Sequence, residues 1–170
     1  MGASREITLR FLAEPSDVNF GGKVHGGNLM RWIDQAGYAC ACGWSGSYCV
    51  TAYVGGISFE KPVAIGDLVE VRARIALTGT TSMHIAVDVF SRGLREVDPV
   101  RTTHCLIVFV AVDEAGRPRP VPLWMPVTDE DRFLADYARE MKAQSARIEA
   151  ERSRWLLPMQ GDAAAAADRR

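Results

Sequence analysis

Residues 17–37 read DVNFGGKVHGGNLMRWIDQAG, a polar, glycine-rich loop that runs directly into a mostly apolar helix. Paired glycines let a backbone approach a neighbouring group closely and adopt angles that a Cβ forbids. The first amides of a helix lack intrahelical partners and carry positive partial charge, so they suit an anion or a developing oxyanion. About two turns further along stands one carboxylate, Asp34, which is costly to bury unless it is paired or used. Donors at a helix start and a carboxylate along it are parts that acyl-transfer hydrolysis needs.

The chain has 170 residues, a length that suits one domain whose core needs no disulfide staples. Its formal net charge of -1 gives no reason to propose nucleic acid or a membrane surface as a partner. No apolar run is long enough to span a bilayer, and no hydrophobic stretch of a signal peptide follows the N-terminal residues. We therefore expect a cytoplasmic protein.

The chain has four cysteines, none of them in a C-x-x-C pair: Cys40, Cys42, Cys49 and Cys105. We expect them to be small buried hydrophobes in a reducing compartment, rather than disulfide partners or zinc ligands. The three histidines are scattered along the chain: His25, His84 and His104. They predict no metal site. We expect His25 to cap or pack the loop and the other two to be satisfied sheet residues.

Patterns rich in alternating apolar and β-forming residues predict strands at 6–12, 48–59, 68–78, 83–90 and 101–112. The helix is predicted from about residue 27 to 42 and is apolar nearly all the way round, which is typical of a buried helix. A proline-rich stretch at 118–126 predicts an extended connector, and acidic residues after Thr128 predict a second helix running to about Trp155. We expect the Ala-rich tail from Gly161 to Arg170 to be disordered.

One antiparallel sheet wrapped around the first helix would bury that helix on most sides, so the sequence predicts an α+β fold. The predicted domain covers residues 1–127, followed by a C-terminal helical extension at 128–157 and a disordered tail at 158–170. Such a sheet leaves edges and one face that need cover, and dimerisation through an edge supplies it.

The chain resembles the hotdog-fold acyl-CoA thioesterases, in particular the acyl-CoA hydrolase group of the bacterial YciA-type enzymes and mammalian brain-type acyl-CoA hydrolase. The resemblance rests first on the motif P-x-D-x-N-x-x-G-x-V-H-G-G at residues 15–27 and on Trp32-Ile33-Asp34-Gln35-Ala36-Gly37. It continues through Ile57-Ser58-Phe59, Pro62-Val63, Gly66-Asp67, Thr81-Ser82-Met83, residues 110–113 and residues 116–122. It covers roughly residues 6–122, and the combination in this order and at these spacings is specific to the family.

The resemblance implies a hotdog fold that hydrolyses a fatty acyl-CoA to free acid and CoA. It implies no cofactor, because coenzyme A is part of the substrate. It also implies a homo-oligomer, a dimer or a trimer of dimers, with active sites at subunit interfaces. Catalysis in the group is ascribed to a loop asparagine and a helix acid, which fall on Asn19 and Asp34, one from each protomer of a dimer.

These residue types fit thioester chemistry, and each also has a structural interpretation. Asp34 either activates water as a general base or attacks the thioester directly, unless it is only a helix carboxylate bonded to a loop. Asn19 either orients the water or donates to the carbonyl, unless it is only a turn asparagine. Gly26 and Gly27 offer backbone amides to the carbonyl oxygen, unless they serve only a tight turn.

Arg117 and Arg119 follow the last strand in a proline-flanked segment, and the planar fork of arginine suits phosphate. We expect one or both to meet the CoA phosphates, with Thr80, Thr81 and Ser82 nearby. A solvated basic turn is the alternative.

Two other functions stay open. One is a hotdog hydratase or dehydratase acting on an acyl thioester, although the different loop motif of those enzymes is not found here. The other is a non-catalytic acyl-CoA-binding or regulatory module, against which the intact Asn19, His25, Gly26, Gly27 and Asp34 argue.

Overall fold

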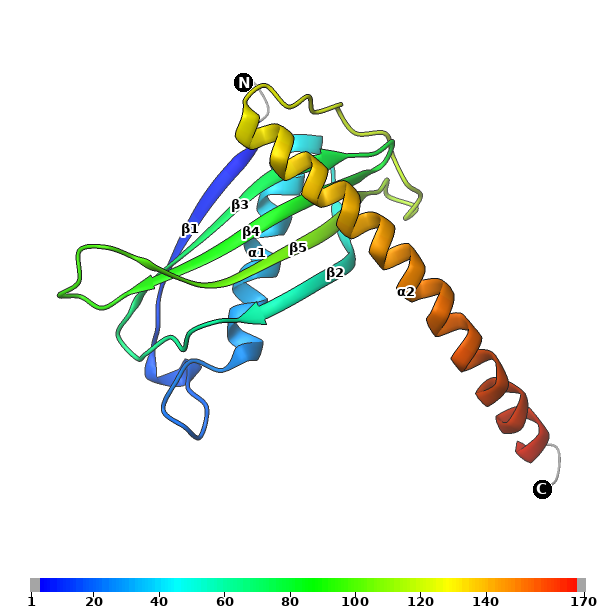
Figure 1. Ribbon diagram of the computed structural model, residues 1–170, viewed down its shortest axis with the longest axis horizontal. Helices are drawn as coiled ribbons and strands as arrows, with labels where there is room; N and C mark the ends of the chain where they lie inside the picture. The colour runs from blue at the N-terminus through cyan, green and yellow to red at the C-terminus, as the bar shows by residue number, and fades with distance from the viewer. Residues whose placement is uncertain (1–3, 168–170) are drawn as a thin grey trace. The chain divides into compact units, whose positions relative to one another are not determined.

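The computed structural model describes residues 4–167 and contains one antiparallel sheet with the strand order β1-β3-β4-β5-β2. The strands are β1 (Glu6–Leu12), β2 (Cys49–Phe59), β3 (Leu68–Thr78), β4 (Ser82–Arg92) and β5 (Val100–Ala111). Helix α1 (Gly26–Ser45) packs on one face of this sheet, and helix α2 (Asp129–Ala167) follows the last strand (Figure 1). The predicted α+β architecture, an antiparallel sheet packed on a long helix with an extra C-terminal helix, is confirmed.

The strand bounds match the sequence analysis to within about two residues, and the larger differences lie at the helix ends. Helix α1 continues past Cys42 to Ser45, because Gly46 closes it in the left-handed conformation, with φ 64°, and donates its amide to the carbonyl of Cys42. Helix α2 continues to Ala167, past the expected end at Trp155. Residues 161–167 of the tail that was expected to be disordered are therefore helical, and residues 168–170 lie outside the described residues.

The sheet covers α1 on one side only. The buried residues of α1 form one stripe: Leu29, Trp32, Ile33, Ala36, Gly37, Cys40 and Ala41. On the other side, Met30 and Tyr38 are 45% and 39% exposed, and Asp34 is exposed too. The prediction that α1 is buried on most sides is therefore wrong for a single chain, because a single five-stranded sheet reaches only one side of a helix.

Gly37 allows α1 to approach the sheet closely. A Cβ on Gly37 would lie 2.7 Å from Cε2 of Phe109 and 3.1 Å from Cγ2 of Ile107. Both neighbours are fully buried on β5, so neither can move aside without repacking the core. The absence of a side chain at position 37 therefore sets the distance between helix and sheet.

Three of the four cysteines are buried in the core, as expected: Cys40, Cys49 and Cys105. Burial raises the pKa of Cys40 and Cys105 to about 12 and that of Cys49 to about 11. Cys42 is half-buried, and all four are free thiols. No helix within residues 4–167 is long and apolar enough to cross a membrane.

Asp131 ties the start of α2 to the first strand. Its carboxylate accepts hydrogen bonds from the amides of Val127 and Thr128 at 3.1 and 3.0 Å and from the guanidinium of Arg5 at 2.5 Å. The hydroxyl of Thr128 accepts in turn from the Asp131 amide, which completes a capping box. The Thr128 amide, with the Arg5 guanidinium, holds the pKa of Asp131 far below its ordinary value.

The compact unit that contains the sheet ends at Ala138, ten residues into α2. Leu134, Ala135 and Ala138 are buried in it, and the ring of Tyr137 lies 5.6 Å from that of His104 on β5. The remainder of α2, from Arg139, forms a second unit. The division into domain, extension and tail stays a prediction.

We expect Gly37→Ala to lower the free energy of unfolding by about 1–3 kcal/mol, because the new methyl group overpacks the contact with Phe109. Gly43→Ala is the matched control on the same helix. No heavy atom lies within 4 Å of a Cβ built there, so alanine should stabilise by roughly 0.5–1 kcal/mol through helix propensity. Denaturant unfolding of both variants measures the difference, and equal stabilities would contradict the close approach.

Asp131→Asn should lower the melting temperature most at neutral pH and by a smaller amount in acid. Because the folded-state pKa of Asp131 is depressed, its stabilisation is complete above the ordinary carboxyl pKa and is lost progressively as the pH falls towards the depressed folded-state value. The difference between the thermal melts of wild type and variant should therefore be smaller at pH 3 than at pH 7 without closing. Asp129→Asn, at a fully exposed carboxylate two residues away, is the control and should change little at either pH.

Candidate active site

Asp17 anchors the loop that precedes α1. Its buried carboxylate accepts from the Glu14 amide at 3.0 Å and from the side-chain amide of Asn28 at 3.2 Å. Its carbonyl accepts from the His25 amide at 2.7 Å. Arg31, one turn further along α1, pairs with the same carboxylate at 3.7 Å. The motif aspartate therefore fixes where the loop begins and where the helix starts.

Asn19 stands at the start of a small hairpin formed by residues 18–24. Val18 bridges to Val24, and the Asn19 amide donates to the carbonyl of Lys23 at 2.7 Å. The side-chain oxygen of Asn19 accepts from the amides of Gly21 and Lys23 at 2.8 and 3.3 Å. The turn role of Asn19 is thus present, while its side-chain amide has no hydrogen-bond partner among the described residues and stays available to a ligand.

His25 caps α1, as expected. Its side chain accepts a hydrogen bond from the Gly27 amide at 3.0 Å, and its carbonyl accepts from the Asn28 amide at 2.9 Å. The expectation that Gly27 offers its amide to a substrate is therefore not met in this arrangement, because the His25 cap already uses that donor. The backbone amide of Gly26, by contrast, has no hydrogen-bond partner among the residues that the structure describes.

Asp34 is held by a residue that the sequence analysis did not single out. The hydroxyl of Thr51 on β2 donates to Oδ1 of Asp34 at 2.7 Å. Oδ2 has no hydrogen-bond partner among the described residues. Asp34 and Thr51 are seventeen residues apart in different elements, so no helical or strand periodicity predicts their contact. The contact forms because β2, which pairs with β5, lies beside α1.

An apolar cavity of about 340 Å³ lies between α1 and β2 beside Asp34. Its lining residues are Gly27, Met30, Arg31, Ile33, Asp34, Val54, Ile57 and Ile107. Asn19 does not line this cavity, so one chain does not bring Asn19 and Asp34 together. That arrangement agrees with a site completed by a second chain.

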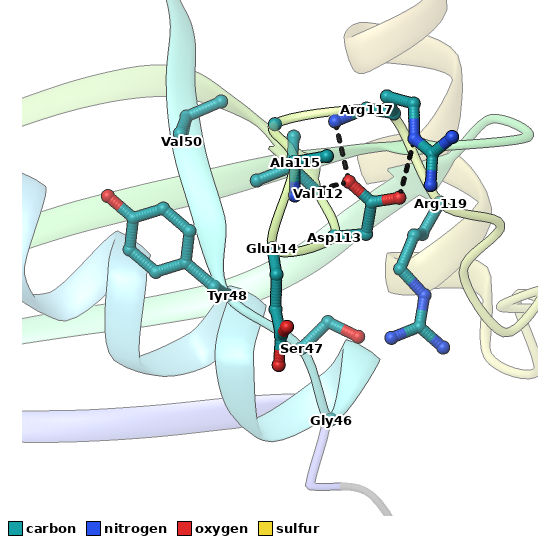
Figure 2. Close-up of a pocket in the computed structure, with 11 residues that line it drawn as sticks. Gly46, Ser47, Tyr48, Val50, Val112, Asp113, Glu114, Ala115, Arg117 and Arg119 are labelled. Atoms are coloured by element: carbon teal, nitrogen blue, oxygen red, sulfur yellow. Dashed lines mark hydrogen bonds and ion pairs between the residues drawn. The ribbon is translucent and has the colours of Figure 1, made fainter.

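A second, larger cavity of about 1050 Å³ lies at the other end of α1 and contains both predicted arginines (Figure 2). Its walls are residues 46–48, Val50, residues 112–117 and Arg119. Arg117 is paired with Asp113, whose carboxylate accepts from the Arg117 amide at 2.8 Å and from its guanidinium at 2.9 Å. These bonds hold the pKa of Asp113 below its ordinary value. The guanidinium of Arg119 has no ion-pair partner among the described residues.

The turn at Thr80, Thr81 and Ser82 lies beside the arginine segment but does not line the cavity. The carbonyl of Thr80 accepts from the Val121 amide at 2.9 Å, and that of Thr81 from the Ala111 amide at 3.1 Å. These backbone hydrogen bonds keep the turn near the arginine segment, as expected. Contact of either with a ligand stays a prediction.

The two strand histidines lie away from both cavities. Nδ1 of His104 is 2.8 Å from Oδ1 of Asp88 on β4, and His84 is buried on the same strand. Burial opposes ionisation of Asp88, but the hydrogen bond with His104 and the charges of Arg74 and Arg101 outweigh it, so the pKa of Asp88 is lowered. His104 is therefore a satisfied sheet residue, as expected.

Comparisons with known proteins identify relatives of the whole sheet region. The profile of the Thioesterase superfamily matches residues 21–97. The acyl-CoA thioester hydrolase YciA of Salmonella typhimurium is 38% identical over 122 residues, which are 69% of this chain and 91% of that protein. Among solved structures, an apo-hexameric acyl-CoA thioesterase superposes with a TM-score of 0.83 at 31% identity, covering 88% of this chain and 97% of that one.

The acyl-CoA hydrolase of Staphylococcus aureus, solved with butyryl coenzyme A, coenzyme A and coenzyme A disulfide, superposes with a TM-score of 0.81 at 26% identity. The match covers 92% of this chain and 98% of that one. That enzyme has also been solved with an aspartate, an asparagine or a threonine replaced by alanine. There the asparagine precedes the aspartate by 15 residues and the threonine follows it by 17, the separations of Asn19, Asp34 and Thr51 here.

Proposed function

The chain belongs to the thioesterase superfamily, as a relative of the YciA-type acyl-CoA thioester hydrolases, and on that premise we propose that it hydrolyses a fatty acyl-CoA to the free acid and coenzyme A. The observation that supports this most is the Asp34–Thr51 hydrogen bond at the wall of an apolar cavity. The carboxylate supplies the reactive group, and the apolar walls suit an acyl chain.

Asp34 is the catalytic carboxylate in this proposal. The Thr51 hydroxyl holds Oδ1, which leaves Oδ2 to take a proton from water or to attack the thioester carbon. In the first case, water adds to the carbonyl carbon as Asp34 takes its proton; the C–S bond then breaks, and the proton passes to the departing CoA thiolate. In the second, Asp34 attacks the carbonyl carbon and the C–S bond breaks, which leaves an anhydride at Asp34 and expels the CoA thiolate; water then cleaves the anhydride and restores the carboxylate. Both routes release the acid and the CoA thiol, and neither needs a cofactor.

The carbonyl oxygen becomes negatively charged as the tetrahedral intermediate forms, so it needs hydrogen-bond donors. The Gly26 amide at the positive end of α1 is one candidate donor. The side-chain amide of Asn19 from a partner subunit is the other. Gly27 acts through the His25 cap, which shapes the helix start.

A homodimer formed through β2 would complete the site. β2 is an edge strand, and its side chains include the exposed Tyr53, Val54 and Phe59. The apo-hexameric acyl-CoA thioesterase that superposes on this chain supports the expected trimer of dimers.

The larger cavity is the proposed site of the CoA phosphates. Arg119 has an unpaired guanidinium at its wall, whereas Asp113 neutralises Arg117 (Figure 2). We therefore assign Arg119 the principal phosphate contact. Arg117, Thr80, Thr81 and Ser82 are supporting contacts.

Asp34→Asn should lower kcat by ~10²–10⁴-fold on every acyl-CoA that the wild type hydrolyses, because it removes the base or nucleophile. Thr51→Val should cost roughly tenfold, since it removes one orienting hydrogen bond, and Thr51→Ser should retain most activity. Release of the CoA thiol measures turnover, and thermal melts check folding. Full activity in Asp34→Asn would contradict the assignment, and binding of acyl-CoA without turnover in the wild type would favour a non-catalytic module.

Arg119→Ala should raise KM roughly tenfold at low salt, with little change in kcat, because it removes a charged contact to phosphate. Arg117→Ala is the matched control and should have the smaller effect, because its charge is already paired with Asp113. The KM values of both variants at low and high ionic strength measure the two contributions. A larger effect at Arg117 would reverse the assignment.

A further inference from the structure

Phe20 has the highest exposed fraction among the large exposed apolar residues of the described chain, at 113%, ahead of Val97 at 87%. Removing an aromatic side chain from water lowers the free energy, so a fully exposed ring in a structured turn is suited to contact a second apolar surface. Phe20 belongs to the hairpin of residues 18–24, whose backbone projects beyond the N-terminal end of α1 (Figure 1).

The hairpin presents this ring through its own hydrogen bonds. Asn19 turns its side-chain oxygen back to the Gly21 and Lys23 amides, and its carbonyl accepts from the Gly22 amide at 3.0 Å. Gly22 adopts φ 71°, which a side chain would strain. The turn therefore forms without any contribution from Phe20, so folding of this segment does not explain the aromatic residue.

The cavity beside Asp34 has apolar residues at its rim. Met30 and Val54, which line it, are 45% and 39% exposed. Val54 lies on β2, the edge strand of the proposed dimer, so this rim is continuous with the proposed interface. A second chain that approaches along β2 therefore meets the rim of the cavity.

We propose that Phe20 of one chain packs on the rim formed by Met30 and Val54 of a second copy and forms part of its acyl-binding wall. This inference rests on the proposed function, in which Asn19 reaches the partner's Asp34. Adjacent Cα atoms are about 3.8 Å apart, so a loop that presents Asn19 there brings Phe20 to the same surface. Phe20 is then a specificity-determining residue for acyl chain length.

A disulfide cross-link tests the placement without using activity. The double variant Phe20→Cys with Met30→Cys, in a Cys42→Ser background, should form a covalent dimer on mild oxidation, visible on a non-reducing gel. Val97→Cys with Met30→Cys is the control and should stay monomeric on the gel, because Val97 lies in the β4–β5 loop. Absence of the covalent dimer in a variant that still oligomerises would overturn the proposal.

The chain-length profile tests the specificity role. In the wild type, each methylene that contacts an apolar wall can raise kcat/KM by up to about fourfold. Phe20→Ala should flatten that rise, Phe20→Leu should restore part of it, and Val97→Ala should leave it unchanged. A wild-type profile in Phe20→Ala would overturn the inference.

The two hypotheses fail in different ways. Loss of turnover in Asp34→Asn, together with an unchanged profile in Phe20→Ala, would retain the proposed function and reject the role of Phe20. Failure of the wild type to hydrolyse any acyl-CoA would reject both.

Discussion

The sheet covers α1 on one side only, and the rest of the structure depends on this constraint. The covered side packs closely because Gly37 lets the helix approach Phe109 and Ile107. The uncovered side keeps Met30, Asp34 and Tyr38 at the surface, where apolar area costs free energy in water. A carboxylate among exposed apolar residues is then accessible to a substrate and also adjacent to any second chain that covers them.

The loop motif combines two kinds of residue. Asp17 and His25 serve structure, since one anchors the loop base and the other caps the helix. Asn19 builds the hairpin with its side-chain oxygen, and the proposed function assigns its side-chain amide to the substrate carbonyl. Phe20 is fully exposed in its own chain, and the proposed contact with a second copy would bury its ring.

Periodicity in the sequence was sufficient for the elements of the fold but not for the partners of individual side chains. The alternation in residues 68–78 predicts β3 at its observed bounds, because strand pattern depends on local spacing. Thr51 was missed, because its contact with Asp34 depends on how β2 lies beside α1. Arg117 and Arg119 look equivalent in sequence, and only the turn that places Asp113 against Arg117 separates them. The sequence does not show that the Gly27 amide is already used, because that depends on the orientation of the His25 ring.

Under the proposed function, one chain alone is an incomplete catalyst, and the same geometry explains why. The hairpin with Asn19 lies before α1, whereas Asp34 lies about two turns along the helix, at the wall of a cavity between α1 and the edge strand β2. Hydrogen bonds through Asp17 fix the hairpin to the helix start, so it cannot fold back to the cavity without losing them. A second chain paired along β2 supplies a hairpin without that cost. Edge pairing would then bury exposed apolar area and assemble the reacting groups in one step, which couples activity to association of the chains.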